Sequence, residues 1–173
     1  MSSVSQKIGG SLSKQSYIRK MFEEGNRLKA IHGADKVFDF SLGNPNLEPP
    51  EELQAALRDL VNNPIPGMHG YMPNAGYPET RAAVAAFLSE EQGVALKGDH
   101  VVMTVGAGGA LNAVFKAVLD PGDEVLTPSP GFVEYDFYVD NHGGVCVHVP
   151  TAPDFDLDLD AIAGGINAKT RIV

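Results

Sequence analysis

The sequence has 173 residues, of which 43% are hydrophobic and 20% charged, a balance typical of a globular protein with one sizeable core or of part of a larger domain. Its formal net charge of -9 leaves no basic surface in bulk, which disfavours a nucleic-acid partner. No apolar run approaches the ~20 residues of a membrane-spanning helix, and the N-terminus has no apolar signal segment. We therefore expect no membrane partner and a cytoplasmic location, which the single cysteine, Cys146, also favours.

The N-terminal part combines one helical pattern with a proline-rich break. Residues 1–15 are polar and glycine-containing, and we expect a loose or extended arm there. From Ser16 apolar residues recur at helical spacing, which predicts a helix that ends at Gly33. Residues 37–42, VFDFSL, alternate enough to predict a short strand. The following stretch, GNPNLEPP, forbids regular structure and is either a linker or a loop that binds through its backbone.

Two further helices flank a long loop. Proline and acid in a first turn predict a helix that begins at Pro50 or Glu51. Residues 62–78 contain four prolines and three glycines, and a loop this long inside a compact domain tends to be functional. The next helix is expected over residues 78–92, with Gly93 closing it.

Residues 101–120, VVMTVGAGGALNAVFKAVLD, predict a buried strand over 101–105, a glycine turn and a helix. The turn, Gly106 to Gly109, has almost no side-chain bulk. A helix start carries unpaired N–H groups and the positive end of a dipole, so this turn is either a phosphate seat or a tight structural turn. A dinucleotide fingerprint is disfavoured, because Leu111 occupies its third glycine position, and the absence of Gly-Lys-Ser/Thr excludes a P-loop.

The C-terminal part alternates short strands with helices. Strands are predicted over 124–127 and 145–149 and from Arg171 onward, and helices over 132–139 and 161–166. This alternation implies parallel pairing with right-handed crossovers. The expected fold class is therefore α/β, with a mostly parallel sheet and helices on both of its faces.

No metal site is predicted. The alternating acids of residues 154–160, DFDLDLD, suggest a calcium loop, but Leu159 and Gly165 stand where that loop needs glycine and glutamate. We expect an amphipathic strand with a solvated acidic face there. The five histidines show no paired metal-binding spacing, and Cys146 is interpreted as a buried small hydrophobe rather than a nucleophile. No G-x-S-x-G elbow supports a serine hydrolase.

Four segments in a fixed order together resemble one protein family. They are SLGNP (41–45), HGYMPNAGYPETR (69–81), TVGAGGALN (104–112) and PSPGFVEY (128–135). They resemble the aspartate aminotransferase-like aminotransferases of class I and II, fold type I, which use pyridoxal 5′-phosphate, and the resemblance covers residues 16–173. It implies that residues 1–45 are an N-terminal arm and helix, part of the small domain. Residues 46–173 would be the first part of the cofactor-binding large domain.

The resemblance also implies roles for individual residues. The backbone N–H groups of Gly106, Ala107 and Gly108 would hold the cofactor phosphate. Phe132 matches the aromatic residue that stacks on the pyridine ring. Tyr71 matches a tyrosine that reaches the phosphate of the neighbouring subunit, which implies a homodimer with shared sites. Gly43 matches the glycine that lies against the substrate carboxylate.

The implied activity is transfer of an amino group from an amino acid to a 2-oxo acid through pyridoxal phosphate, in the manner of aspartate aminotransferases, with the donor itself left open between aspartate and alanine. None of the lysines in the sequence occupies the family's Schiff-base lysine position. No catalytic residue is therefore assigned, and we expect the 173-residue chain alone to be inactive. Two alternatives stay open: a lyase or synthase of the same fold, and a non-catalytic regulator or partner subunit that binds pyridoxal phosphate.

Overall fold

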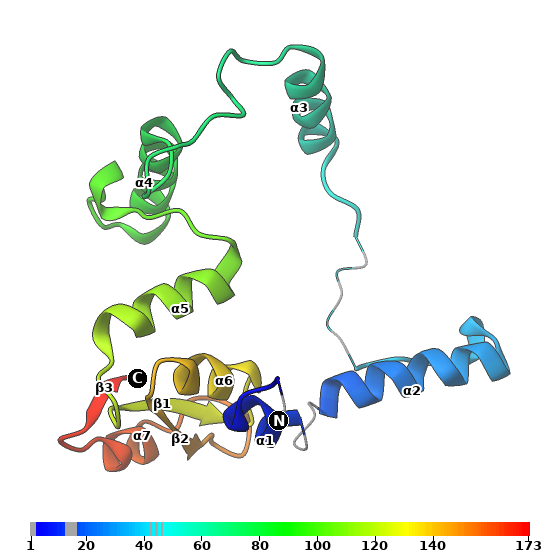
Figure 1. The fold of residues 1–173 in the computed structure, drawn as a ribbon, viewed down its shortest axis with the longest axis vertical. Helices are drawn as coiled ribbons and strands as arrows, with labels where there is room; N and C mark the ends of the chain where they lie inside the picture. The colour runs from blue at the N-terminus through cyan, green and yellow to red at the C-terminus, as the bar shows by residue number, and fades with distance from the viewer. Residues whose placement is uncertain (1–2, 13–16, 42, 44, 46) are drawn as a thin grey trace. The chain divides into compact units, whose positions relative to one another are not determined.

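The computed structural model describes residues 3–12, 17–41, 43, 45 and 47–173 (Figure 1). The chain forms two compact units, Met1–Met68 and His69–Val173. Within the described ranges, no helix is both long and apolar enough to cross a membrane.

The first unit contains only helices as regular structure in its described residues. They are α1 (Gln6–Leu12), α2 (Tyr17–His32), the 3-10 turn η1 (Ala34–Lys36) and α3 (Glu51–Asn62). α2 confirms the first predicted helix, although its expected start at Ser16 lies outside the described residues. Gly33 ends α2 with a φ of 95°, and its N–H donates to Lys29 O at 3.0 Å. α3 begins directly after Pro50, as predicted.

Two expectations for the first unit are wrong. The described part of the expected loose arm contains α1, because the Ser5 Oγ accepts a hydrogen bond from the Ile8 N–H at 3.2 Å and caps the helix. The strand expected over 37–42 is not formed; its last residue lies outside the described ones. No strand lies beside this segment in the described part of the first unit, and the Asp39 side chain bonds to Lys29 of α2.

The second unit contains the sheet. Its elements are α4 (Pro78–Gln92), η2 (Gly98–His100), α5 (Gly106–Val118), β1 (Glu124–Ser129), α6 (Glu134–Asn141), β2 (Val145–Pro150), α7 (Leu159–Gly165) and β3 (Thr170–Ile172). The three strands are parallel, in the order β2-β1-β3. The register places Val125 beside Cys146 and Thr127 beside His148. The predicted α/β class with parallel pairing is confirmed.

Helices cover both faces of the central strand β1. Because side chains alternate along a strand, Val125 and Leu126 point to opposite faces. Val125 packs with Phe115 of α5 and Val139 of α6. On the other face, a Cβ placed on Gly165 of α7 would lie 2.9 Å from Leu126 Cδ2, so α7 contacts the sheet there. The predicted arrangement of helices on both faces is confirmed.

Two strand predictions in the second unit are wrong. Residues 101–105 form no strand, because no strand of the described chain lies beside them; the Met103 N–H donates instead to Ala75 O at 2.9 Å. Over 154–160 a turn leads into α7. The Asp158 carboxylate caps that helix by accepting a hydrogen bond of 2.9 Å from the Ala161 N–H. This cap favours the start of a helix where the alternating sequence predicted a strand.

Candidate functional site

The glycine turn forms the first turn of α5. Gly106 has a φ of 67°, which residues with side chains rarely adopt, and its N–H donates to Thr104 O at 3.1 Å. Among the described side chains, none caps this helix. The N–H groups of Ala107 and Gly108 therefore have no partner within the helix and lie at the positive end of its dipole. This arrangement can bind an anionic group such as a phosphate.

The first turn of α5 is held against α6. A Cβ on Gly108 would lie 3.0 Å from Tyr138 Oη, so the turn and this side chain are in close contact. Asn112 donates from Nδ2 to Gly108 O at 2.8 Å, and its Oδ1 lies 3.1 Å from His142 Nε2. Tyr135 lies three residues before Tyr138 and therefore on the same side of α6. Helix α6 thus connects the glycine turn to the aromatic group that follows β1.

Phe132 follows β1 and lines a cavity of about 310 Å³. The residue is 51% exposed. The ring meets Tyr135 edge-on, with centroids 5.4 Å apart and an interplanar angle of 77°. Thr127, Asp136 and His148 also line this cavity. A half-exposed ring at a cavity can stack on a planar ligand.

The motif at 69–81 is tied to the segment that enters the glycine turn. Gly76 has a φ of 99°, and a Cβ on it would lie 2.6 Å from Met103 Cγ. Arg81, whose side chain is only 15% exposed, donates from Nε to Val101 O at 2.7 Å. Sequence reasoning missed both contacts, because neither spacing nor composition indicates which distant segment a loop glycine or a helical arginine will meet.

The other two predicted site residues are Tyr71 and Gly43. Tyr71 belongs to the second unit, and its ring is fully exposed, so it does not pack on the glycine turn of its own chain. Gly43 belongs to the first unit, where nothing lies within 4 Å of a Cβ placed on it. The structure therefore links only the glycine turn and Phe132, through α6.

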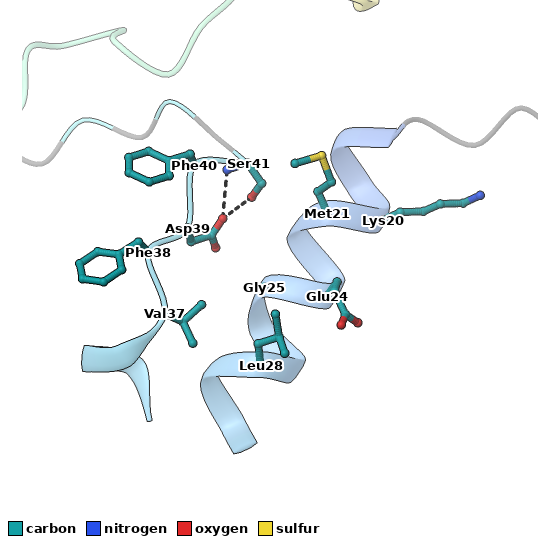
Figure 2. Close-up of a pocket in the computed structure, with 10 residues that line it drawn as sticks. All are labelled: Lys20, Met21, Glu24, Gly25, Leu28, Val37, Phe38, Asp39, Phe40 and Ser41. Carbon is teal, nitrogen blue, oxygen red and sulfur yellow. Dashed lines mark hydrogen bonds between the residues drawn. The ribbon is translucent and has the colours of Figure 1, made fainter. Parts of the chain in front are cut away.

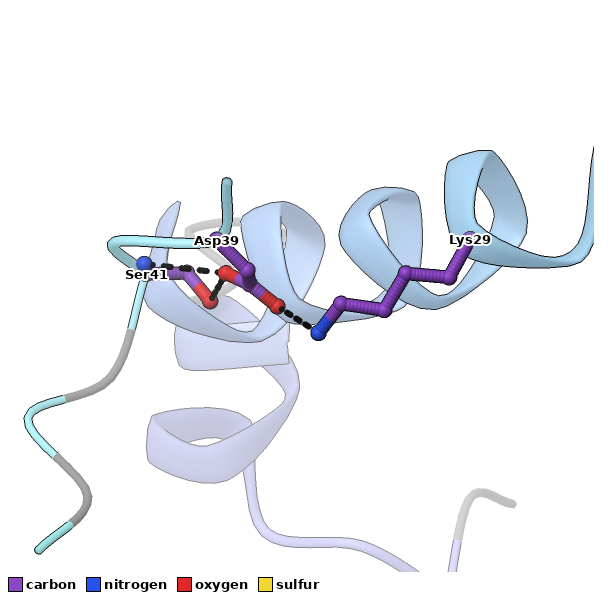
Figure 3. A network of polar contacts seen from close by, with 3 residues as sticks. All are labelled: Lys29, Asp39 and Ser41. Carbon is purple, nitrogen blue, oxygen red and sulfur yellow. Dashed lines mark hydrogen bonds and ion pairs between the residues drawn. The ribbon is translucent and has the colours of Figure 1, made fainter. Parts of the chain in front are cut away.

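A polar network in the first unit fixes Ser41, which lies two residues before Gly43 in the sequence. Asp39 accepts hydrogen bonds from Lys29 Nζ at 2.7 Å, from Ser41 Oγ at 2.6 Å and from the Ser41 N–H at 3.0 Å (Figure 3). The Lys29 ammonium, followed by the two Ser41 bonds, holds the pKa of the Asp39 carboxyl well below its usual range. A Cβ on Gly25 would lie 2.8 Å from Asp39 Oδ2, so glycine leaves the room that this carboxylate needs.

A cavity of about 520 Å³ lies beside this network, between α2 and residues 37–41 (Figure 2). Figure 2 shows Asp39 directed toward α2 and the rings of Phe38 and Phe40 directed away from it. These two residues are 84% and 91% exposed. Sequence reasoning found the alternation of this segment but not the Asp39 network, because alternation alone does not indicate which helix the acidic residue will meet.

Comparison with known proteins gives a consistent result. The model of the aminotransferase class I and II family matches residues 35–173. The chain is 37% identical over 141 residues to the probable aspartate/prephenate aminotransferase of Thermus aquaticus, a match that covers 80% of this chain and 36% of that protein. It is 32% identical over 164 residues to the aspartate aminotransferase of Pyrococcus horikoshii, covering 94% of this chain and 40% of that protein.

Solved structures agree. An amino transferase from Eubacterium rectale superposes with a TM-score of 0.90 at 36% identity, covering 99% of this chain and 44% of that one. The aspartate aminotransferase of Thermus thermophilus with maleate superposes with a TM-score of 0.81 at 30% identity and the same coverage. The chain thus spans less than half the length of these relatives. Over its matched length it has both their sequence pattern and their fold, and it belongs to the class I and II aminotransferase family.

Proposed function

We propose that this chain is part of an aminotransferase that moves an amino group from an amino acid to a 2-oxo acid through pyridoxal 5′-phosphate, with aspartate as the donor. The observation that carries the proposal is the family match over residues 35–173, which includes both the glycine turn and Phe132. The aspartate donor rests on relatives that are named aspartate aminotransferases. The activity is proposed for the full-length protein, and the 173-residue chain alone is proposed to be inactive.

The residues present fit the proposed cofactor. Ala107 and Gly108 offer N–H groups without side-chain bulk at the start of α5, which suits a phosphate. The Gly106 N–H already donates to Thr104 O, so it is not available to the phosphate. Gly106 instead contributes its left-handed backbone conformation, which forms the turn. Phe132 supplies an aromatic face at the end of β1. When bound, pyridoxal phosphate supplies an electron sink for the carbon that carries the amino group.

Each proposed site residue has a separate task. Ala107 and Gly108 hold the phosphate without a charged side chain, and Phe132 excludes water from one face of the ring. Gly43 leaves room for the substrate carboxylate. Tyr71, fully exposed within its own chain, reaches the phosphate of the neighbouring subunit in a homodimer.

The remaining assignments complete the proposal. Residues 1–45 belong to the small domain, and residues 46–173 form the first part of the large, cofactor-binding domain. The enzyme works in the cytoplasm on amino acids and 2-oxo acids, without a nucleic-acid or membrane partner.

The test uses the full-length protein, saturated with pyridoxal phosphate and incubated with 2-oxoglutarate and each of a panel of amino acids. Chromatography should detect glutamate with aspartate as donor and an equal amount of oxaloacetate. Release of carbon dioxide or ammonia without glutamate would instead indicate a lyase or synthase. Cofactor binding without turnover of any donor would indicate a regulator or partner subunit. A purified chain that ends at Val173 should show no turnover.

A further inference from the structure

A group of chemically active side chains lies where α6 meets β2, and two of its members line the cavity that Phe132 also lines. Asp136 belongs to α6, and Cys146 and His148 belong to β2. A carboxylate oxygen, a sulfur and an imidazole nitrogen from these three residues lie within 4.8 Å of one another. Cys146 and His148 share one face of β2 because side chains alternate along a strand, and α6 packs on that face.

Direct contacts hold the three side chains together. His148 Nε2 lies 2.9 Å from Asp136 Oδ1. The hydroxyl of Thr127, on the neighbouring strand β1, lies 3.2 Å from His148 Nδ1 and 3.3 Å from Cys146 Sγ. Thr127 is only 8% exposed, so its hydroxyl lies on the buried side of the cluster. The side chains of Asp136 and His148 are each 50% exposed, so an ion can reach them from solvent.

The donor set selects a class of ion. Thiolate, imidazole and carboxylate are the ligands of zinc and related transition metals, whereas calcium and magnesium require sets of oxygen ligands. Zinc bonds of about 2.0–2.3 Å place tetrahedral ligand atoms about 3.3–3.8 Å apart. The separation of up to 4.8 Å therefore closes by small side-chain rotations. Two of the three residues line the cavity of about 310 Å³, which leaves room for a water ligand.

We propose that Asp136, Cys146 and His148 form a binding site for a divalent transition metal of the zinc type, with a fourth position open to water. Thr127 holds His148 through Nδ1, which leaves Nε2, the nitrogen that faces Asp136, for the metal. On binding, the S–H bond of Cys146 breaks, a sulfur–metal bond forms, and the proton passes to solvent with no transfer of electrons.

Cobalt(II) is the probe, because a cobalt–thiolate bond gives a charge-transfer band in the near ultraviolet. The full-length protein is freed of metal with a chelator and titrated with cobalt(II), alongside the variants Cys146→Ser, His148→Gln and Asp136→Asn. His32→Gln, at an exposed position in the first unit, is the matched control. A second measurement needs no variant: the alkylation rate of the peptide that contains Cys146 is followed by mass spectrometry with and without zinc.

The proposal expects a thiolate band that saturates at one equivalent, is absent in Cys146→Ser and is unchanged in His32→Gln. Loss of His148 or Asp136 should weaken binding at least tenfold, since even outer-shell partners of metal ligands change affinity by about 10- to 100-fold. Zinc should slow alkylation of Cys146, because the thiolate is both nucleophile and ligand. Absence of the band, its persistence in Cys146→Ser, or an unchanged alkylation rate would overturn the site. None of these readouts depends on amino transfer, so the proposed function stands or falls separately.

Discussion

Gly165, the last residue of α7, lies against the sheet, and its replacement by alanine is expected to destabilise the second unit. A Cβ at this position would lie 2.9 Å from Leu126 Cδ2 and 3.0 Å from Val149 Cγ1, closer than carbon atoms pack. Leu126 and Val149 are 1% and 5% exposed, so neither side chain can move into solvent. The added methyl group must displace α7 or force these side chains from their preferred rotamers.

The expected loss of stability follows from two opposing effects. Over-packing a well-filled core costs about 1–3 kcal/mol. Alanine in place of glycine within a helix returns up to about 1 kcal/mol, because it restricts the unfolded chain. With the middle of the over-packing range, about 2 kcal/mol, the net loss in Gly165→Ala is about 1–2 kcal/mol, a change of about 5- to 30-fold in the ratio of folded to unfolded protein.

The preceding residue provides a matched control, because nothing lies within 4 Å of a Cβ placed on Gly164. Gly164→Ala should be neutral or stabilise the protein by up to about 1 kcal/mol. Urea denaturation followed by circular dichroism measures both variants, and adding Leu126→Val to Gly165→Ala should recover part of the loss. Equal denaturation midpoints for the two alanine variants would refute the contact between α7 and the sheet.

Three further outcomes are expected. The loss of stability in Asp39→Asn should depend on pH. Because the pKa of Asp39 is lower in the folded protein than in the unfolded chain, its ionised carboxylate stabilises the fold fully above the unfolded pKa of about 3.9. This contribution is lost as the pH falls from there through the folded pKa. Denaturation curves of wild type and variant should therefore converge in acid, and a constant gap would contradict the network. Arg81→Lys removes the Nε bond to Val101 O and should cost about 1–3 kcal/mol in thermal denaturation, whereas Arg58→Lys, at an exposed position, should cost almost nothing. Phe132→Leu should weaken pyridoxal phosphate binding about 3- to 10-fold, whereas Phe132→Tyr should not, and equal affinities in an absorbance titration would contradict stacking.

Local signals account for the parts of the fold that were predicted. α4 starts at Pro78 and ends before Gly93, which has a φ of 66°, and β1, α6, β2 and α7 were predicted within two residues at each end. Residues 101–105 have a strand's composition, but a strand also needs a neighbour, and its neighbour cannot be deduced from the segment itself. The cap at Asp158 is local, yet the strict alternation of acids and apolar residues masked it.

Sequence reasoning likewise reached only part of the candidate site. The order of four motifs pointed to the glycine turn and Phe132, whose cofactor roles remain predictions, and α6 contacts both of them in the structure. Two polar groups were missed, because each joins residues from separate elements of its own unit: Asp39 with Lys29 in the first unit, and Asp136 with the cysteine and histidine of β2 in the second. A search for paired histidine spacing finds ligands that share one helix or loop, and therefore overlooks a set divided between a helix and a strand.

Two hydrogen bonds of Asn112, one within α5 and one to His142 at the end of α6, also determine which nitrogen of this histidine carries its proton. Asn112 Nδ2 donates to Gly108 O, which turns the amide oxygen toward α6. An amide oxygen only accepts, so His142 Nε2, 3.1 Å away, must be the protonated nitrogen of the neutral ring. If Nδ1 also takes up a proton, Nε2 remains a donor and the bond persists. The connection that holds the glycine turn to α6 is therefore the same in either charge state of this ring.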